Sequence, residues 1–279
     1  MKESGSEPTP VTIIQPDTGW QLIDFRELFR YRDLAYTLVW RDITVQYAQT
    51  ILGFAWAIIT PLVQIVIFTI VFGKVAKIPT DGVPYVLFAT AGIIPWTYMS
   101  TVMLQSSQSL VTNHNMLGKI YFPRLLYPLT PVFSKMLNFA ISLTVLVVIM
   151  VYYRVDPTPQ LLYLPVFILM MMMVPAGIGM LMSAMAIRFR DVRFAMQYFM
   201  QMLMYTAPIV YSASTIPENY RLLYSLNPIV GVIEGYRACL LGTEIPWQFI
   251  LPGMVTAVAL LVVGALYFKR IERIFVDVL

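Results

Sequence analysis

The chain has 279 residues, of which 58% are hydrophobic and 12% are charged, and its formal net charge is +4. A water-soluble domain carries about 25% charged residues, so this composition excludes a soluble globular protein and indicates a polytopic membrane protein. The only cysteine, Cys239, excludes an internal disulfide, and with the only histidine, His114, it leaves too few ligands for a zinc site.

The first 50 residues divide into two predicted segments. Residues 1–19 are rich in Pro, Ser, Thr and Glu and are predicted to form a disordered cytoplasmic tail. Residues 20–50 are predicted to hold an amphipathic helix, over Trp20–Trp40, that lies in the membrane interface without crossing it. A soluble helix packed on a neighbour is the alternative. The first apolar run starts well past residue 30 behind a polar tail, so no cleavable signal peptide is expected.

Residues 51–279 contain six apolar runs close to the roughly 20 residues that cross a bilayer. They are Ile51–Phe72, Val83–Leu104, Met136–Tyr153, Leu161–Ile187, Phe194–Tyr211 and Phe249–Phe268. An earlier start of the third run, near Leu125, stays open if Lys135 lies at the interface or snorkels. With the amino terminus in the cytosol, fourteen Lys and Arg residues lie inside and five outside. By the positive-inside rule, both termini are predicted to be cytoplasmic.

Two polar stretches between these runs are unusual. Asn113–Pro131 is short and basic, and near-helical spacing of its apolar residues predicts a small amphipathic helix offered to a cytosolic partner. Ser212–Gln248 is predicted to hold two short helices, Pro217–Ser225 and Pro228–Leu241, that dip back into the outer leaflet where protein or a water-filled cavity shelters them.

The ends of the second short helix have local signals. Asn227 is a suitable N-cap ahead of a proline at the first helical position, and Gly242 supplies a stop. The predicted fold class is therefore an all-α polytopic membrane protein. It has six transmembrane helices, an N-terminal amphipathic interface helix and two short re-entrant outer helices.

The predicted spans contain no ionisable residue, with Lys135 placed at an edge, so coupling to a proton gradient is not expected. No GxxxxGK[ST] phosphate-binding loop is present, since Gly118-Lys119 is followed by Ile120. Energy for uphill transport is therefore expected to come from another polypeptide.

Polar side chains recur every three or four residues along the first, second and fifth predicted spans. Hydrogen-bonding groups mixed with aromatic faces suit sugars, which offer hydroxyls and apolar C–H faces, so the stripes predict a polar conduit. Two alternatives stay open: such residues often only bond neighbouring helices, and Trp and Tyr often only mark the interface. The residues predicted to line the conduit are Trp56, Gln64, Tyr98, Gln105, Gln197, Gln201, Tyr205 and Tyr211.

From about Asp24 onward, the sequence resembles the membrane permeases of type-2 ABC exporters for O-antigen, capsular polysaccharide and teichoic acid. Five segments in the family's order carry the resemblance: Arg26–Leu62, Gly118–Leu129, the FRD motif at Phe189–Asp191, Asn227–Arg237 and Glu272–Leu279. The Gram-negative O-antigen permease is the most similar type.

The resemblance implies a homodimer of six-span subunits in the bacterial inner membrane, working with two separate ATPase subunits. ATP and Mg would be bound by those subunits, so this chain is expected to hold no cofactor and to be a permease and not an enzyme. The implied substrate is an undecaprenyl-type lipid-linked polysaccharide. Membrane lipids are the other expected partners, and nucleic acid is not one.

The resemblance also assigns roles to residues. The ATPase-coupling set on the basic island is His114, Lys119, Tyr121, Phe122 and Arg124. The outer gate is Asn227, Glu234 and Arg237, and the last two, three residues apart on one helix face, are predicted to pair with each other or across the dimer axis. The residues expected to meet the substrate's pyrophosphate are Arg26, Arg30, Arg32 and Arg41. Ordinary contacts of these arginines with anionic lipids are an equal alternative.

Two other functions stay open: a type-2 permease for small hydrophobic drugs, and a membrane glycan polymerase or ligase. A polymerase or ligase needs an acid, a base or an arginine-rich loop at the outer face. The predicted outer face has no histidine and few charges, which disfavours that enzyme class.

Overall fold

The computed structural model describes residues 25–48, 50, 52–113 and 122–272, and these residues form helices and connections with no strand among them. The all-α prediction is confirmed for this part of the chain. In chain order the helices are α1 (Phe25–Arg30), α2 (Arg32–Tyr47), α3 (Ala55–Phe68), α4 (Tyr85–Thr112), α6 (Leu126–Ser134), α7 (Met136–Tyr152), α8 (Leu164–Arg188), α9 (Val192–Thr206), α10 (Glu218–Ser225), α11 (Pro228–Leu241) and α12 (Trp247–Glu272). A π-helical segment, Thr69–Val75, extends α3, and short 3₁₀ turns lie at Pro159–Tyr163 and Ala213–Thr215.

Five helical segments among the described residues are long and apolar enough to cross a membrane. They are Ala55–Val75, Tyr85–Thr112, Leu126–Tyr152, Pro159–Arg188 and Trp247–Glu272. These correspond to the first, second, third, fourth and sixth predicted spans. The third begins at Leu126, as the open alternative allowed, so Lys135 lies within it and not at its edge.

The fifth predicted span, Phe194–Tyr211, is not confirmed. Helix α9 has 15 residues, and a helix of that length is only about 22 Å long against about 30 Å of hydrocarbon. Its end has a local cause: Ala207 adopts an extended conformation with ψ of 146°, as the residue before a proline tends to do. The next residue is Pro208.

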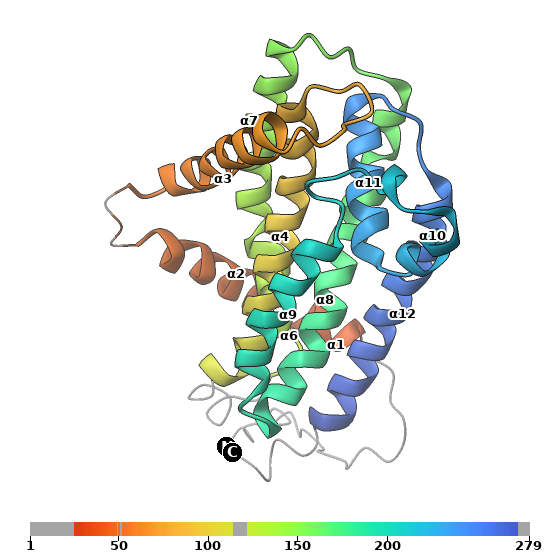
Figure 1. Cartoon of the computed structure of the whole chain (residues 1–279). Coiled ribbons are helices and arrows are strands. Elements are labelled where there is room, and N and C mark those ends of the chain that lie inside the picture. The colour runs from red at the N-terminus through yellow and green to blue at the C-terminus, as the bar shows by residue number, and fades with distance from the viewer. Residues whose placement is uncertain (1–24, 49, 51, 114–121, 273–279) are drawn as a thin grey trace, which may run out of the picture.

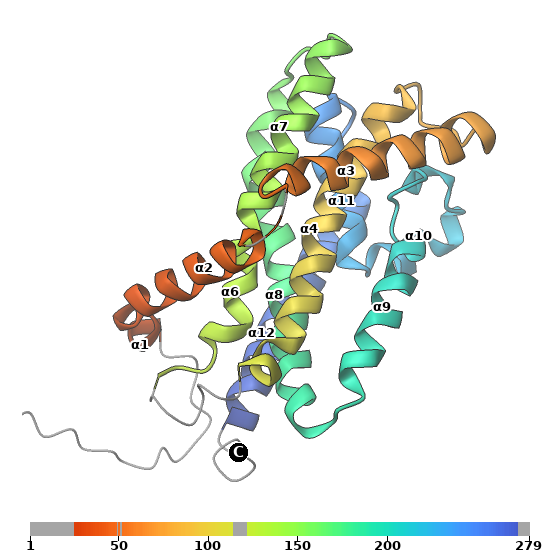
Figure 2. The ribbon, with the colours of Figure 1, turned by 90° about the vertical axis from the view of Figure 1, so that its left-hand side faces the viewer.

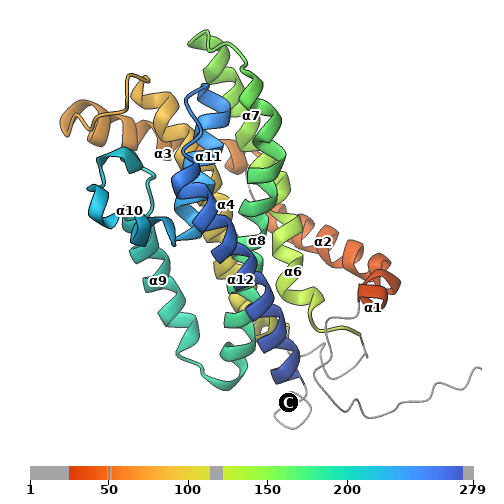
Figure 3. The ribbon, with the colours of Figure 1, turned by 90° about the vertical axis from the view of Figure 1, so that its right-hand side faces the viewer.

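The long helices α4, α8 and α12 lie side by side and run in the same direction, whereas the α6–α7 pair runs in the opposite direction (Figure 1). Helix α8 packs between α4 and α12. Helix α11 contacts all three of these helices toward one end of the bundle (Figure 3). Glycines allow the closest approach: a Cβ atom added to Gly264 of α12 would overlap the carbonyl of Gly177 of α8. Small residues bring helix backbones together in this way in membrane proteins.

Substitution of Gly264 by valine is expected to force α8 and α12 apart and to lower the amount of folded protein in membranes several-fold. Overpacking a tight interface costs about 1–3 kcal/mol, and here the clash is with backbone that cannot rotate away. Ala259→Val, at an exposed position of the same helix, is the matched control. Quantitative immunoblotting and thermal unfolding of the purified variants measure the effect, and equal behaviour of the two variants would contradict the packing argument.

Helices α2 and α3 lie across the bundle, unlike the other long helices (Figure 2). The predicted interface helix Trp20–Trp40 is present from Phe25 as α1 and α2, which break at Tyr31 and continue to Tyr47. Its amphipathic character is not confirmed. On α2, Leu38 is buried against α6, whereas Tyr36 and Trp40 are exposed and stack on each other.

The two predicted short helices are confirmed as α10 and α11, although the structure does not test whether they re-enter a membrane. Helix α10 starts after Pro217. The Asn227 side chain accepts a hydrogen bond of 3.1 Å from the Ile229 N–H, which is the predicted N-cap. Gly242 ends α11 with a φ of 70°, in the left-handed region that glycine tolerates best.

Cations gather at one end of the bundle, which we call the basic end, where α4, α8 and α12 end and α6 and α9 begin (Figure 1). The described Lys and Arg residues on these segments and on α1 and α2 are Arg26, Arg30, Arg32, Arg41, Arg124, Arg188, Arg190, Arg193, Lys269 and Arg270. Helices α10 and α11 lie toward the opposite end.

Candidate functional site

The opposite end contains a buried ion pair on α11. Arg237 Nη1 lies 2.9 Å from Glu234 Oε1, and the two side chains are 4% and 11% exposed. Because the residues are three apart on one helix, they share a face. Of the two predicted arrangements, the structure shows the pair within one subunit.

Further contacts fasten the α9–α10 connection to this pair. Arg237 Nη2 donates hydrogen bonds to the carbonyls of Pro208 at 2.8 Å and Ile209 at 3.3 Å. Glu234 accepts one from the Ala213 N–H at 3.0 Å. The pair thus holds backbone groups of a connecting segment that neither residue belongs to.

Helix α4 forms the other wall around the Arg237 guanidinium. The central guanidinium carbon of Arg237 lies 3.6 Å from the centre of the Phe88 ring, which is a cation–π contact. A Cβ atom at Gly92 would lie 2.7 Å from Arg237 Nη2, so only glycine leaves room here. Burial raises the pKa of the Glu234 carboxyl, while Arg237 and the Ala213 N–H oppose that rise.

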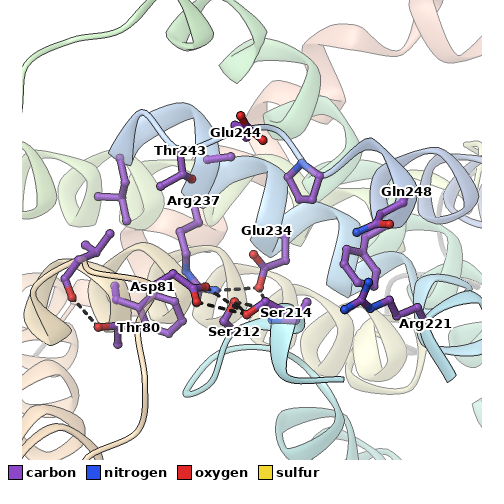
Figure 4. A pocket seen from close by; sticks show the side chains of 17 residues that line it. Thr80, Asp81, Ser212, Ser214, Arg221, Glu234, Arg237, Thr243, Glu244 and Gln248 are labelled. Carbon is purple, nitrogen blue, oxygen red and sulfur yellow. Dashed lines mark hydrogen bonds and ion pairs between the residues drawn. The ribbon is translucent and has the colours of Figure 1, made fainter. Parts of the chain in front are cut away.

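A cavity of about 220 Å³ opens beside the ion pair (Figure 4). Asp81, which has a φ of 52°, accepts a hydrogen bond from the Ser214 hydroxyl at 3.2 Å and so connects the α3–α4 loop to the α9–α10 connection. The other polar lining residues are Thr80, Ser212, Arg221, Thr243, Glu244 and Gln248. These contacts can hold the α3–α4 loop and the α9–α10 connection against α11.

A second cavity, of about 320 Å³, lies between α2, α4 and α6 toward the basic end. We call it the inner cleft. Its polar lining comes from Arg41, Asp42 and Gln46 on α2, from Gln105, Gln108, Ser109 and Thr112 on α4 with Asn113 after it, and from Tyr127 and Thr130 on α6 with Lys135 after it.

A buried lysine at the α6–α7 junction closes one side of the inner cleft. Lys135 Nζ lies 3.3 Å from Asp42 Oδ2 and donates a hydrogen bond of 2.7 Å to Gln46. Ser134 also donates to the Asp42 carboxylate. The side chain of Lys135 is only 3% exposed. The Asp42 carboxylate on α2 therefore keeps Lys135 inside the protein, and its depth in the membrane stays a prediction.

Arg41 and Tyr127 form another part of the cleft wall. Arg41 Nη2 donates a hydrogen bond of 3.0 Å to Asn113, whose amide is held in turn by the Ser109 carbonyl at 2.8 Å. Tyr127 is close enough to Arg41 for an electrostatic interaction. Its hydroxyl is buried and has no hydrogen-bond partner among the residues that the structure describes.

The predicted coupling residues are only partly visible. His114, Lys119 and Tyr121 lie outside the described residues. Phe122 is buried, with its ring centre 5.4 Å from that of Tyr127, so this arrangement does not offer it to a partner. The Arg124 N–H donates a hydrogen bond of 3.2 Å to Glu272 and so ties the end of the basic island to α12.

The predicted conduit residues lie in several different environments of the described chain. Tyr98 is buried in the core, where its hydroxyl bonds the Val132 carbonyl at 2.7 Å, and Gln64 accepts a bond of 3.3 Å from Thr97. Tyr211 bonds the hydroxyl of Tyr224. Gln105 lines the inner cleft. The remaining four side chains are exposed on α3 and α9: Trp56, Gln197, Gln201 and Tyr205.

The predicted pyrophosphate-binding arginines separate into two groups. Arg26 and Arg30 are on the short α1, and Arg32, with 66% of its side chain exposed, pairs with Asp33. Arg41 alone of the four lines the inner cleft. The structure thus brings Arg41 together with Gln105, which were predicted separately.

Sequence reasoning missed Asp42, Lys135, Gln46 and Tyr127 as parts of a site. One available signal was Lys135 within the apolar stretch that starts near Leu125, since a charge there needs a partner inside the protein.

Comparison with known proteins gives a consistent result. A family model described as ABC-2 type transporter matches residues 33–241. An O-antigen export system permease protein, RfbA, of Klebsiella pneumoniae is 25% identical over 88% of this chain and 95% of its own length. The protein of that name from Myxococcus xanthus is 26% identical over 79% and 85%. The polysialic acid transport protein KpsM of Escherichia coli is 22% identical over 83% and 91%.

Proposed function

Because the chain belongs to the ABC-2 type transporter family, we propose that it is the membrane subunit of an ATP-driven exporter that moves a lipid-linked polysaccharide, most closely an O-antigen, out of the cytosol. The observation that carries the proposal is the near full-length similarity to permeases named for O-antigen and polysialic acid. Five candidate spans in the described residues agree with a membrane subunit.

In the proposed assembly, two copies of the chain form the channel and two ATPase subunits bind at the basic end. Helices α3 and α9 both flank α4 (Figure 2), and their exposed side chains would form the channel wall once a second copy faces them. Trp56 is 49% exposed and Tyr205 is 79% exposed. Aromatic faces suit a sliding polymer because they stack on successive sugar rings through weak contacts that need no fixed register.

Deletion of the gene in its bacterial host tests the function. Loss of surface polysaccharide is expected, with lipid-linked polymer accumulating on the cytosolic face of the membrane. Complementation by the full chain should restore export only when a functional ATPase subunit is present. Normal surface polysaccharide in the deletion strain would overturn the proposal.

Replacing Trp56 or Tyr205 by alanine is expected to slow the export of long chains more than that of short ones. Each variant removes one weak stacking contact of a type worth about 1–3 kcal/mol on nucleic-acid bases, and the effect accumulates over every sugar that passes. Gel profiles of surface polysaccharide, with permease abundance from the same cells, measure it.

Tyr152→Ala is the matched control, because Tyr152 is 81% exposed at the C-terminal end of α7 and is not one of the predicted conduit residues. An export loss that only follows falling abundance, without dependence on chain length, would point to membrane anchoring and against a conduit.

A further inference from the structure

The cavity beside the Glu234–Arg237 ion pair, which we call the outer cavity, has two unlike walls (Figure 4). One wall comes from the α3–α4 loop and the α9–α10 connection, and its polar groups bond one another. The Ser214 hydroxyl lies 3.2 Å from the Asp81 carboxylate and 2.9 Å from the Ser212 hydroxyl, both within hydrogen-bond distance. This wall therefore has few hydrogen-bonding groups left for a ligand.

The other wall comes from the α11–α12 connection and the first turn of α12. Thr243, Glu244 and Gln248 line the cavity there, and none of these side chains is hydrogen-bonded to a residue that the structure describes. They offer a hydroxyl, a carboxylate and a carboxamide, and Pro246 adds apolar surface beside them. A sugar ring matches this set, because its hydroxyls donate and accept hydrogen bonds and its C–H groups pack on apolar surface.

The charge of the lining limits which sugar fits. Three carboxylates and two guanidinium groups line the cavity, which leaves a net charge of −1. Both arginines already face a glutamate, at 2.9 Å and 3.4 Å, whereas Asp81 and Glu244 have no cationic partner among the described residues. A negatively charged ligand is repelled by such a lining and a neutral ligand is not. The cavity therefore suits an uncharged sugar and excludes a sugar acid or a phosphate.

The size and the place of the cavity fit one residue of a polymer. Its volume is about 220 Å³, and a cavity of about 150 Å³ already holds one benzene ring. Helix α3, through its π-helical extension, leads into the α3–α4 loop, and α9 leads into the α9–α10 connection. The two helices proposed as the channel wall thus both lead to segments that line this cavity.

We propose that the outer cavity binds one uncharged pyranose residue of the exported glycan and discriminates against acidic sugars. The hydroxyls of the ring bond Glu244, Gln248 and Thr243, and one C–H face of the ring packs on Pro246. The proposal rests on the proposed function, because it names the class of sugar that the exporter accepts at this end of the channel.

Saturation-transfer NMR titrations of the full chain in phosphatidylcholine nanodiscs test the proposal. The probes are the methyl pyranosides of glucose, galactose and mannose, each compared with the uronic acid that differs only in a carboxylate at C6. At least one neutral pyranoside is expected to bind, and its uronic acid should bind about 5-fold more weakly or worse, as one repulsive pair of charges at about 4 Å predicts. The difference should shrink between about 10 mM and about 150 mM salt, because salt screens exposed charges.

Two variants at exposed positions separate charge from hydrogen bonding. Glu244→Gln removes an unpaired negative charge and should at least halve the difference between a neutral sugar and its uronic acid. Gln248→Met should weaken the neutral sugar about 3- to 10-fold, the effect of one lost hydrogen bond. Asp156→Asn and Gln160→Met are the matched controls, because both residues lie in the α7–α8 connection outside the cavity lining. Both controls should bind as the unaltered protein does, and thermal unfolding of every variant separates lost binding from lost folding.

An amine is the other ligand that two unpaired carboxylates attract, so ethanolamine is the competing probe. Displacement of the sugar by ethanolamine at equal concentration would make the cavity an amine site and overturn the proposal. Absence of binding by all three neutral pyranosides, or equal binding of a neutral sugar and its uronic acid, would also overturn it. If deletion of the gene abolishes surface polysaccharide while no pyranoside binds, the exporter function stands and this site does not.

Discussion

Arg237→Ala is expected to cost about 3–5 kcal/mol of stability at the end of the bundle that holds α11, because it leaves the Glu234 carboxylate buried without its charged partner. The substitution also removes the hydrogen bonds to the Pro208 and Ile209 carbonyls. Those bonds hold the α9–α10 connection, so we expect this segment to open before the rest of the protein unfolds.

The chain supplies a matched control for this pair. Arg221 and Glu218 have the same spacing and lie 3.4 Å apart on α10, but the glutamate side chain is 86% exposed. Exposed pairs typically contribute about 0–1 kcal/mol, and Arg221 donates one further hydrogen bond, of 3.2 Å, to the Ile216 carbonyl. Arg221→Ala should therefore cost clearly less than Arg237→Ala. The double substitution Glu234→Gln, Arg237→Met should be milder than Arg237→Ala, because no isolated charge remains.

Two measurements test this prediction. Thermal unfolding gives the loss of stability, and labelling of a cysteine placed at Ser212, which is only 4% exposed, with the buried Cys239 changed to serine, reports opening of the connection. Faster labelling in Arg237→Ala than in Arg221→Ala is expected. Equal rates and equal stabilities would show that the pair does not hold this segment.

Local signals explain why the opposite end was predictable from sequence. The bounds of α11 follow from a capping Asn227, a proline behind it and Gly242, all within a few residues of the helix ends that they set. The pairing of Glu234 with Arg237 follows from a spacing of three on one helix. The loop carbonyls that complete this arrangement come from 28 and 29 residues away, and no pattern in a single sequence indicates them.

Hydropathy predicted the ends of helices less well, because an apolar run marks the residues suited to the bilayer and not the residues that are helical. The second predicted span stopped at Leu104, where polar residues begin, yet α4 continues to Thr112 and so carries Gln105 and Gln108 into the inner cleft. The fifth predicted span extended beyond the true helix because the residues around Pro208 remain apolar. In both cases composition was interpreted correctly and backbone geometry was not.

The inner cleft shows most clearly what could not be predicted from the sequence. Arg41 and Gln105 were predicted for two separate roles, and only the packing of α2 on α6 beside α4 joins them. Lys135 was treated as the boundary of an apolar run because its partner, Asp42, lies 93 residues earlier in the sequence.

The two side chains of the Lys135–Asp42 ion pair are buried to different extents, so we expect their substitutions to lower stability by different amounts. Lys135 is 3% exposed, whereas 32% of the Asp42 side chain reaches the surface. Asp42→Asn removes the negative charge but keeps an oxygen for the Ser134 hydroxyl. It strands the lysine ammonium inside the protein, at an expected cost of about 3–5 kcal/mol. Lys135→Met leaves a carboxylate that water already contacts, so its cost should be clearly smaller.

Membrane abundance and thermal unfolding of the purified chain measure this order. Asp33→Asn is the control on the same helix, because Asp33 is 96% exposed and lies 3.8 Å from Arg32. It should behave as the unaltered protein does. Combining Asp42→Asn with Lys135→Met should recover most of the stability lost in Asp42→Asn, since the stranded charge is gone. If Lys135→Met lowers stability as much as Asp42→Asn does, the lost stability comes from packing at the α6–α7 junction. The unpaired charge of Lys135 would then not be what makes the contact between α2 and the bundle important.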